Sequence, residues 1–131
     1  MIKIVLLGAG NLGSLLTAKL LNNKAINLVQ VYNRSIEKIK YLKNKIEITD
    51  NLSELKKADI YILCVSDDTI SEVSSKLNFP NSMVVHTSGG TSLNELKSNS
   101  KKGVLYFPQT FSKKRTIDFS NIPICIETEN K

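Results

Sequence analysis

The sequence is poor in the residue types that build most metal and nucleophile sites. It has one histidine, two cysteines and no tryptophan among 131 residues. Cys64 and Cys125 each lie inside an apolar run, far from a second cysteine or a histidine at metal-ligand spacing. We therefore predict two buried thiols and no metal site.

Long apolar runs are also lacking. None approaches the roughly 20 residues that a helix needs to cross a bilayer. The N-terminal run, Ile2–Leu7, is too short for a secretory signal and has no cleavage site after it. We expect a cytoplasmic protein with no membrane partner.

Arginine is scarce although the chain is basic. The formal net charge is +6, and only 2 of the 18 basic residues are arginine, with the lysines scattered along the chain. A nucleic-acid-binding surface would concentrate its basic residues. The densest cluster, Lys113 to Arg115, lies in a polar stretch typical of a solvated loop. We expect no nucleic-acid partner.

Short apolar runs rich in isoleucine and valine predict strands buried on both faces. They are Ile2–Leu7, Leu28–Tyr32, Ile46–Ile48, Ile60–Val65, Met83–Val85, Val104–Phe107 and Ile122–Ile126. Helical spacing appears between them, in segments beginning near Leu12, Ile36, Leu52, Asp67 or Asp68, and Leu93; in the second of these the apolar positions are Ile36, Ile39, Tyr41 and Leu42. This alternation predicts one α/β domain over residues 1–131, with a doubly wound, mostly parallel sheet of the Rossmann type in three α/β/α layers.

A glycine-rich turn, Gly8-Ala9-Gly10-Asn11-Leu12-Gly13, follows the first run and opens the first helical segment. Gly8 suits a sharp turn, Gly10 a close approach of a pyrophosphate, and Gly13 tight packing of helix on strand. Free N–H groups near Asn11 and Leu12 would meet the pyrophosphate. The alternative is that these glycines serve only the bend. The context favours a dinucleotide site.

The segment Asn33-Arg34-Ser35 follows the second run, 20 residues beyond Gly13. NAD-binding domains place a carboxylate there, which accepts from the ribose 2′-hydroxyl. Here an uncharged Asn33, the guanidinium of Arg34 and the hydroxyl of Ser35 suit a 2′-phosphate. Alternatively, Asn33 and Ser35 cap the next helix. We predict NADP as the cofactor, ahead of NAD and coenzyme F420.

These motifs resemble the N-terminal domain of a superfamily of NADP-linked reductases. It includes pyrroline-5-carboxylate reductase, 6-phosphogluconate dehydrogenase and the coenzyme F420-dependent NADP reductases. Three further segments are similar to the hallmarks of one family within it, which pairs a Rossmann-like domain with a helical domain called DUF2520. They are Val65-Ser66-Asp67-Asp68-Thr69-Ile70, Val85-His86-Thr87-Ser88-Gly89 and Gln109-Thr110-Phe111-Ser112.

The resemblance implies roles for residues beyond the glycine turn. Val65 and Ser66 would line the dinucleotide, and Thr87 and Ser88 would face its nicotinamide end together with His86. The single histidine is then a candidate catalytic proton donor, with a structural role as the alternative. Asp67 and Asp68 are more typical of a helix start than of a paired-carboxylate site.

The resemblance also implies a second half. In that family a helical domain follows, completes the substrate site and builds a homodimer, and we expect it to be absent from these 131 residues. Two functions stay open from the sequence. One is the cofactor domain of an NADP-dependent oxidoreductase of unknown substrate; the other is a non-catalytic dinucleotide-binding module, either a sensor or a remnant.

Overall fold

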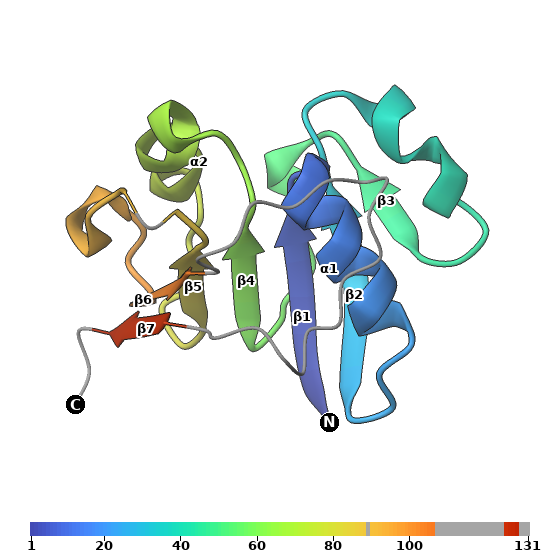
Figure 1. The fold of residues 1–131 in the computed structure, drawn as a ribbon, viewed down its shortest axis with the longest axis horizontal. Coiled ribbons are helices and arrows are strands. Elements are labelled where there is room, and N and C mark those ends of the chain that lie inside the picture. The colour runs from blue at the N-terminus through green and yellow to red at the C-terminus, as the bar shows by residue number, and fades with distance from the viewer. Residues whose placement is uncertain (89, 107–124, 129–131) are drawn as a thin grey trace.

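The protein folds around one seven-stranded sheet with helices on both faces (Figure 1). The computed structural model describes residues 1–88, 90–106 and 125–128. Its strands are β1 (Ile2–Leu7), β2 (Ile26–Tyr32), β3 (Glu47–Thr49), β4 (Ile60–Leu63), β5 (Met83–His86), β6 (Lys101–Tyr106) and β7 (Cys125–Thr128). Their order is β3-β2-β1-β4-β5-β6-β7, and every neighbouring pair is parallel except β6 and β7. The predicted doubly wound, mostly parallel sheet is confirmed.

Alternate residues of the strands point to opposite faces of the sheet and pack in two separate cores, one on each face. Ile4 and Leu6 of β1 pack in the core that lies under α1 (Asn11–Leu21) and η1 (Ile36–Leu42). Val5 and Leu7 pack in the opposite core with α2 (Ile70–Ser75). A strand that buries both faces between helices gives the three predicted layers.

The second helical segment is a 3-10 helix, η1, although its apolar spacing is compatible with an α-helix. Ile36, Ile39 and Leu42 recur every three residues, and a helix with three residues per turn places all three on one side. Tyr41, which the helical pattern assigns to the apolar face, is 60% exposed. That part of the prediction is wrong.

The remaining helical elements are short. They are η2 (Leu52–Glu54), η3 (Asp67–Thr69), which leads directly into α2, and η4 (Leu93–Glu95). Asn51 caps η2, as its side chain accepts a hydrogen bond from the backbone N–H of Ser53. Within the described residues, no helix has the length and apolar character needed to cross a membrane.

Two predicted strands differ from those observed in ways that matter for the site. The run Ile60–Val65 forms a strand only to Leu63, so Cys64 and Val65 belong to the loop that follows. The run Ile122–Ile126 is described only from Cys125, where β7 begins. Gly89, the segment Gln109 to Ser112 and the basic cluster from Lys113 to Arg115 lie outside the described residues.

The chain reverses its direction of travel across the sheet between β1 and β4. From β1 it proceeds outward to β2 and β3, then crosses back to β4 on the other side of β1. Ligands of open α/β sheets bind at the carboxyl ends of the strands that flank such a switch point. In Figure 1 these ends form the upper edge of the sheet. The loops after Leu7 and Leu63 therefore border the expected crevice.

Candidate nucleotide-binding site

The glycine turn begins at a residue that only glycine can occupy. Gly8 has φ of 116°, and a Cβ there would overlap the carbonyl oxygen of Cys64. Two backbone hydrogen bonds fix the turn between its neighbours: the N–H of Gly8 donates to the oxygen of Tyr32 at 2.8 Å, and that of Cys64 to the oxygen of Leu7 at 2.7 Å. The turn is thus held by both β2 and the loop after β4.

The other two glycines serve different purposes. A Cβ on Gly13 would collide with the carbonyl oxygen of Gly8, so the first turn of α1 can approach β1 only because Gly13 lacks one. Among the described residues, a Cβ on Gly10 would meet no atom within 4 Å apart from those of its chain neighbours. Gly10 is exposed, and no described contact requires glycine there. The open space in front of it is where a ligand can come close to the backbone.

The N-terminus of α1 has no side-chain cap. Its N-cap is Gly10, no acidic residue lies in its first turn, and its first hydrogen bond runs from the N–H of Ser14 to the oxygen of Gly10 at 2.9 Å. The N–H groups of Asn11 and Leu12 precede that bond and have no intrahelical acceptor. Together with the helix dipole they favour an anion at this end.

The segment after β2 is held by two hydrogen bonds of Asn33, and no side chain caps the start of η1. The N–H of Asn33 donates to the oxygen of Thr49 at 3.1 Å, and the Asn33 side-chain amide donates to the oxygen of Ser35 at 2.8 Å. Ser35 is the N-cap of η1, yet its hydroxyl makes no capping hydrogen bond. No described carboxylate forms an ion pair with the exposed Arg34. The Ser35 hydroxyl and the Arg34 guanidinium therefore remain available to a ligand.

These segments surround a cavity of about 520 Å³, called here the main cavity. Seven of its lining residues were predicted from the sequence: Gly8, Ala9, Gly10, Asn33, Arg34, Val65 and Ser66. Seven more were not: Tyr32, Leu52, Cys64, Thr69, Glu72, Val73 and Lys76. The missed residues come from the end of β2, from η2, from the loop directly after β4, and from η3 and α2 with the residue that follows α2. The alternation of the strand runs locates those elements, but no local motif marks their side chains as ligand-facing.

Charged groups gather around the Tyr32 hydroxyl. Burial raises its pKa above the usual value; the positive charge of Arg34 lowers it, and the negative charges of Asp50 and Glu72 raise it. The cavity wall therefore carries both signs of charge close together, which suits a ligand that has both anionic and neutral polar parts.

The thiol of Cys64 has low nucleophilic reactivity. Burial raises its pKa to about 12, and a hydrogen bond with Thr87 offsets this only in part. Cys64 is half-buried as a residue, but its thiol is withdrawn from solvent and stays protonated near neutral pH. A nucleophilic role requires the thiolate, so burial disfavours it for Cys64. The side chain of Cys125 lies outside the described part of the chain.

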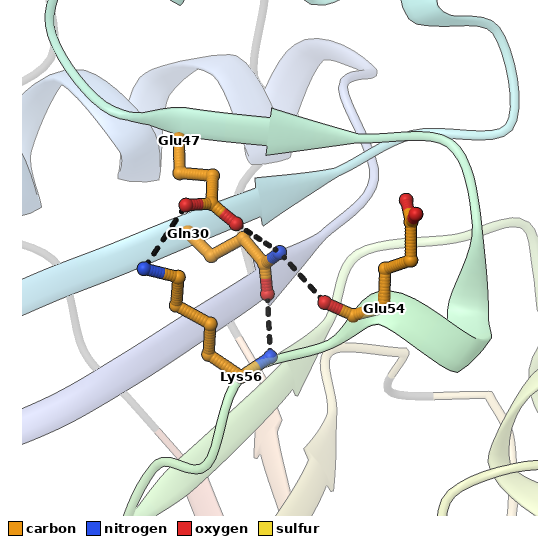
Figure 2. A network of polar contacts seen from close by, with 4 residues as sticks. All are labelled: Gln30, Glu47, Glu54 and Lys56. Carbon is orange, nitrogen blue, oxygen red and sulfur yellow. Dashed lines mark hydrogen bonds and ion pairs between the residues drawn. The ribbon is translucent and has the colours of Figure 1, made fainter.

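A buried polar network fixes the wall that carries η2 (Figure 2). Gln30, which is 0% exposed, donates from Nε2 to the carbonyl oxygen of Glu54 at 3.1 Å and to Oε2 of Glu47 at 3.3 Å. Its Oε1 accepts from the N–H of Lys56 at 2.8 Å, and the Lys56 ammonium pairs with Glu47 at 3.0 Å. The Gln30 side chain thus links β2 to β3, to the last residue of η2 and to Lys56, which lies two residues further along the chain.

His86 is 0% exposed and does not line the main cavity. Its Nδ1 accepts from the N–H of Ser88 at 3.1 Å, and Nε2 lies 3.3 Å from the carbonyl oxygen of Ser92. Since an N–H donates to Nδ1, the proton of the neutral ring must be on Nε2. Both nitrogens are occupied by the loop after β5, which suits a positioning residue. The catalytic role assigned to His86 stays a prediction.

We expect the neutral form of the His86 ring to carry its proton on Nε2, because the reverse tautomer would place two N–H donors against each other at Ser88. A two-dimensional multiple-bond proton–nitrogen spectrum of the imidazole distinguishes the two forms. A spectrum of the Nδ1–H tautomer would contradict this geometry. It would also leave Nε2 free as a base.

Thr87 and Ser88, also predicted to face the ligand, lie outside the main cavity. The hydroxyl of Thr87 donates to the carbonyl oxygen of Leu63 at 3.2 Å, and that of Ser88 lies 2.9 Å from the Thr91 hydroxyl. Both residues follow the carboxyl end of β5, beside β4. They are placed along the same edge of the sheet as the main cavity, one strand further on.

Comparison with known proteins decides the family. The model of the family described as NADP oxidoreductase, coenzyme F420-dependent, matches residues 3–90. The chain belongs to this family. It is also 32% identical over 97 residues to pyrroline-5-carboxylate reductase of Methanobrevibacter smithii, across 67% of this chain and 39% of that protein. The narrower resemblance to proteins with a DUF2520 domain stays a prediction.

One solved structure agrees with this assignment to the NADP oxidoreductases, and a more distant one shares the fold. A provisionally named NADP oxidoreductase from Bacteroides fragilis is 35% identical and superposes with a TM-score of 0.86 over 98% of this chain and 52% of its own. Prephenate dehydrogenase from A. aeolicus, solved with NAD⁺, shares the fold at 14% identity, with a TM-score of 0.77 over 100% of this chain and 52% of its own. The chain spans about half the length of these relatives or less.

Proposed function

We propose that this chain is the NADP-binding domain of an NADP-dependent oxidoreductase. The observation that carries the proposal is the end of β2, where Arg34 and Ser35 follow the strand and Asn33 stands in place of the carboxylate that accepts from a ribose 2′-hydroxyl in NAD-binding domains. A guanidinium has only hydrogen-bond donors, and a hydroxyl has one donor besides its acceptor lone pairs. Both can therefore donate to the oxygen atoms of a phosphate. A carboxylate in that place would instead repel it.

The main cavity and the residues next to its lining offer a separate contact for each part of the cofactor; Asn11, Leu12 and Ser35 are not in the lining itself but directly follow Gly10 and Arg34, which are. The N–H groups of Asn11 and Leu12 would hold the pyrophosphate, approached across Gly10. Asn33, Arg34 and Ser35 would hold the 2′-phosphate. Bound NADP would supply hydride-transfer chemistry. The protein's part is to bind, orient and shield the reacting end.

Residues of the loops after β4 and β5 would contact the dinucleotide between its pyrophosphate and its nicotinamide. Val65 and Ser66 line the main cavity directly after β4. Thr87 and Ser88 follow the adjacent strand and would lie further along the same edge. His86 beneath them holds the loop with both of its ring nitrogens. This order would put the nicotinamide end on the β5 side of the sheet.

We propose that residues outside this chain form the substrate pocket and the second wall of the reaction site. The relatives that match here are about twice as long or longer, since the chain covers 39% of one and 52% of another. A helical domain that also forms a homodimer fits the family resemblance. Hydride transfer needs a site closed to water, which one open α/β edge does not provide by itself.

Direct titration tests the choice of cofactor. Calorimetry on the purified chain with NADP, NAD and coenzyme F420 in turn should show NADP binding most tightly, because only its 2′-phosphate uses Arg34. Equal affinities for NADP and NAD would contradict the role of Arg34. Tighter binding of coenzyme F420 than of either dinucleotide would contradict the proposed cofactor.

A further inference from the structure

A second hollow, of about 640 Å³, adjoins the main cavity and is called here the side hollow. The two share the lining residues Tyr32, Leu52 and Lys76, so they are compartments of one groove. The side hollow is completed by Asp50, Asn51 and Ser53, which follow β3. It extends the groove away from the glycine turn, past the end of β2.

Most polar groups of the side hollow are already engaged. The Asn51 side-chain oxygen accepts from the N–H of Ser53 at 3.0 Å and from its hydroxyl at 2.7 Å. Within the described residues, no hydrogen bond or ion pair engages the Asp50 carboxylate or the Lys76 ammonium. One charged acceptor and one charged donor therefore remain in the lining of the side hollow. Asp50 comes from the β3–η2 turn, and Lys76 from the end of α2.

Hydrogen bonds of its neighbours hold the turn that carries Asp50. The hydroxyl of Thr49 donates to the Glu54 carboxylate at 2.9 Å and accepts from the N–H of Asn51 at 3.1 Å. The Gln30 network of Figure 2 anchors the far end of the same segment to β2. A polar group held on such a frame loses little freedom when it binds a ligand, which makes it effective in discrimination.

The proposed function determines what enters the side hollow. If the 2′-phosphate lies at Arg34, the adenosine ribose lies at the end of β2, and the base attached to it extends into the groove beyond. The walls there offer the apolar side chain of Leu52 and the ring of Tyr32 to the faces of a flat base. Asp50 and Lys76 stand where the polar edge of that base would lie.

We propose that Asp50 and Lys76 read the Watson–Crick edge of adenine and make the site specific for this base. The 6-amino group would donate to the Asp50 carboxylate, and N1 would accept from the Lys76 ammonium. Hypoxanthine inverts both positions, with a carbonyl oxygen in place of the amino group and an N–H at N1. It would set an acceptor against Asp50 and a donor against Lys76. This inference rests on the proposed binding of NADP.

Four ligands test the inference: NADP, NAD and the two analogues in which hypoxanthine replaces adenine. Both analogues should bind the wild-type chain about tenfold or more weakly than their parents, since each unmatched charged group loses a hydrogen bond. Asp50→Asn and Lys76→Gln should each reduce this ratio, because an amide can turn either its donor or its acceptor toward the base. The double variant should approach a ratio of one.

Lys24→Gln is the matched control. Lys24 is exposed and precedes β2, at the opposite edge of the sheet from the groove. The same loss of one positive charge should leave the ratio of adenine to hypoxanthine ligands unchanged. A similar change in ratio for Lys24→Gln and Lys76→Gln would mean that net charge, not contact with the base, sets it, and would overturn the inference.

Two other outcomes would overturn the inference and leave the proposed function standing. In the first, the wild-type chain binds NADP and its hypoxanthine analogue equally well. In the second, Lys76→Gln weakens NADP but not NAD, which would make Lys76 a contact of the 2′-phosphate. If neither NADP nor NAD binds, the proposed function fails, and the inference fails with it.

Discussion

Replacement of Gly10 by alanine is expected to remove most dinucleotide affinity and leave the fold intact. In the part of the chain that the structure describes, a Cβ at this position meets no atom within 4 Å beyond its chain neighbours, so we expect no steric cost to folding. The methyl group instead occupies the space through which a pyrophosphate reaches the N–H groups of Asn11 and Leu12. Losing hydrogen bonds to a charged group at about 1.5 to 3 kcal/mol each corresponds to roughly tenfold or more in affinity per bond. Calorimetric titration with NADP measures this loss.

Gly8→Ala is the matched control, because it is expected to act on the fold. Its φ of 116° strains any side chain, and the Cβ would overlap the Cys64 carbonyl oxygen. The two effects together should lower the free energy of unfolding by about 3 kcal/mol or more. Denaturant unfolding followed by circular dichroism separates the two variants. An unstable Gly10→Ala, or a Gly10→Ala that binds NADP normally, would contradict the role given to Gly10.

Arg34→Ala is expected to weaken NADP by about 10- to 100-fold and NAD by much less. A charged hydrogen bond to phosphate contributes about 1.5 to 3 kcal/mol, and NAD has no group at that place to lose. Because Arg34 is exposed, the effect should shrink as the salt concentration rises. Titration of both dinucleotides at two ionic strengths measures the difference.

Two controls sharpen the Arg34 experiment. Arg34→Lys keeps the charge and loses the planar fork of donors, so it should retain part of the preference for NADP. Lys24→Ala removes a charge from the far edge of the sheet and should change neither affinity. An Arg34→Ala chain that loses NADP and NAD equally would show that Arg34 supports the whole groove and not the 2′-phosphate.

The local parts of the site could be predicted from the sequence because each depends on neighbouring residues. Gly8 and Gly13 are required by a turn and by a helix that begins directly after it, and the structure uses both as the motif predicts. Arg34 follows the second strand at the spacing expected of the ribose-binding position, and the structure places it in the main cavity. Strand, turn and helix occur here in one continuous segment.

The other half of the groove could not be predicted in this way, because the fold assembles it from distant segments. Leu52 and Lys76 are separated by more than 20 positions, and they line the same hollows only because β4 crosses back beside β1. The histidine could not be interpreted either. His86 ends a strand at the ligand edge, as a catalytic group would, but both of its nitrogens are occupied by the backbone of its own loop.

The type of helix was ambiguous for a similar reason. Ile36, Ile39 and Leu42 fit the apolar face of an α-helix and of a 3-10 helix equally well at this length. Only the packing of the segment on the sheet decides between them, and that packing left Tyr41 outside the core. Spacing alone therefore predicted the boundaries of η1 correctly and one of its apolar contacts wrongly.

A crystal structure of this chain soaked with NADP tests the central claim most directly. The account predicts the pyrophosphate against the N–H groups of Asn11 and Leu12, in front of Gly10, and the 2′-phosphate against Arg34 and Ser35. Density for the cofactor elsewhere on the molecule, or a 2′-phosphate turned away from Arg34, would contradict it.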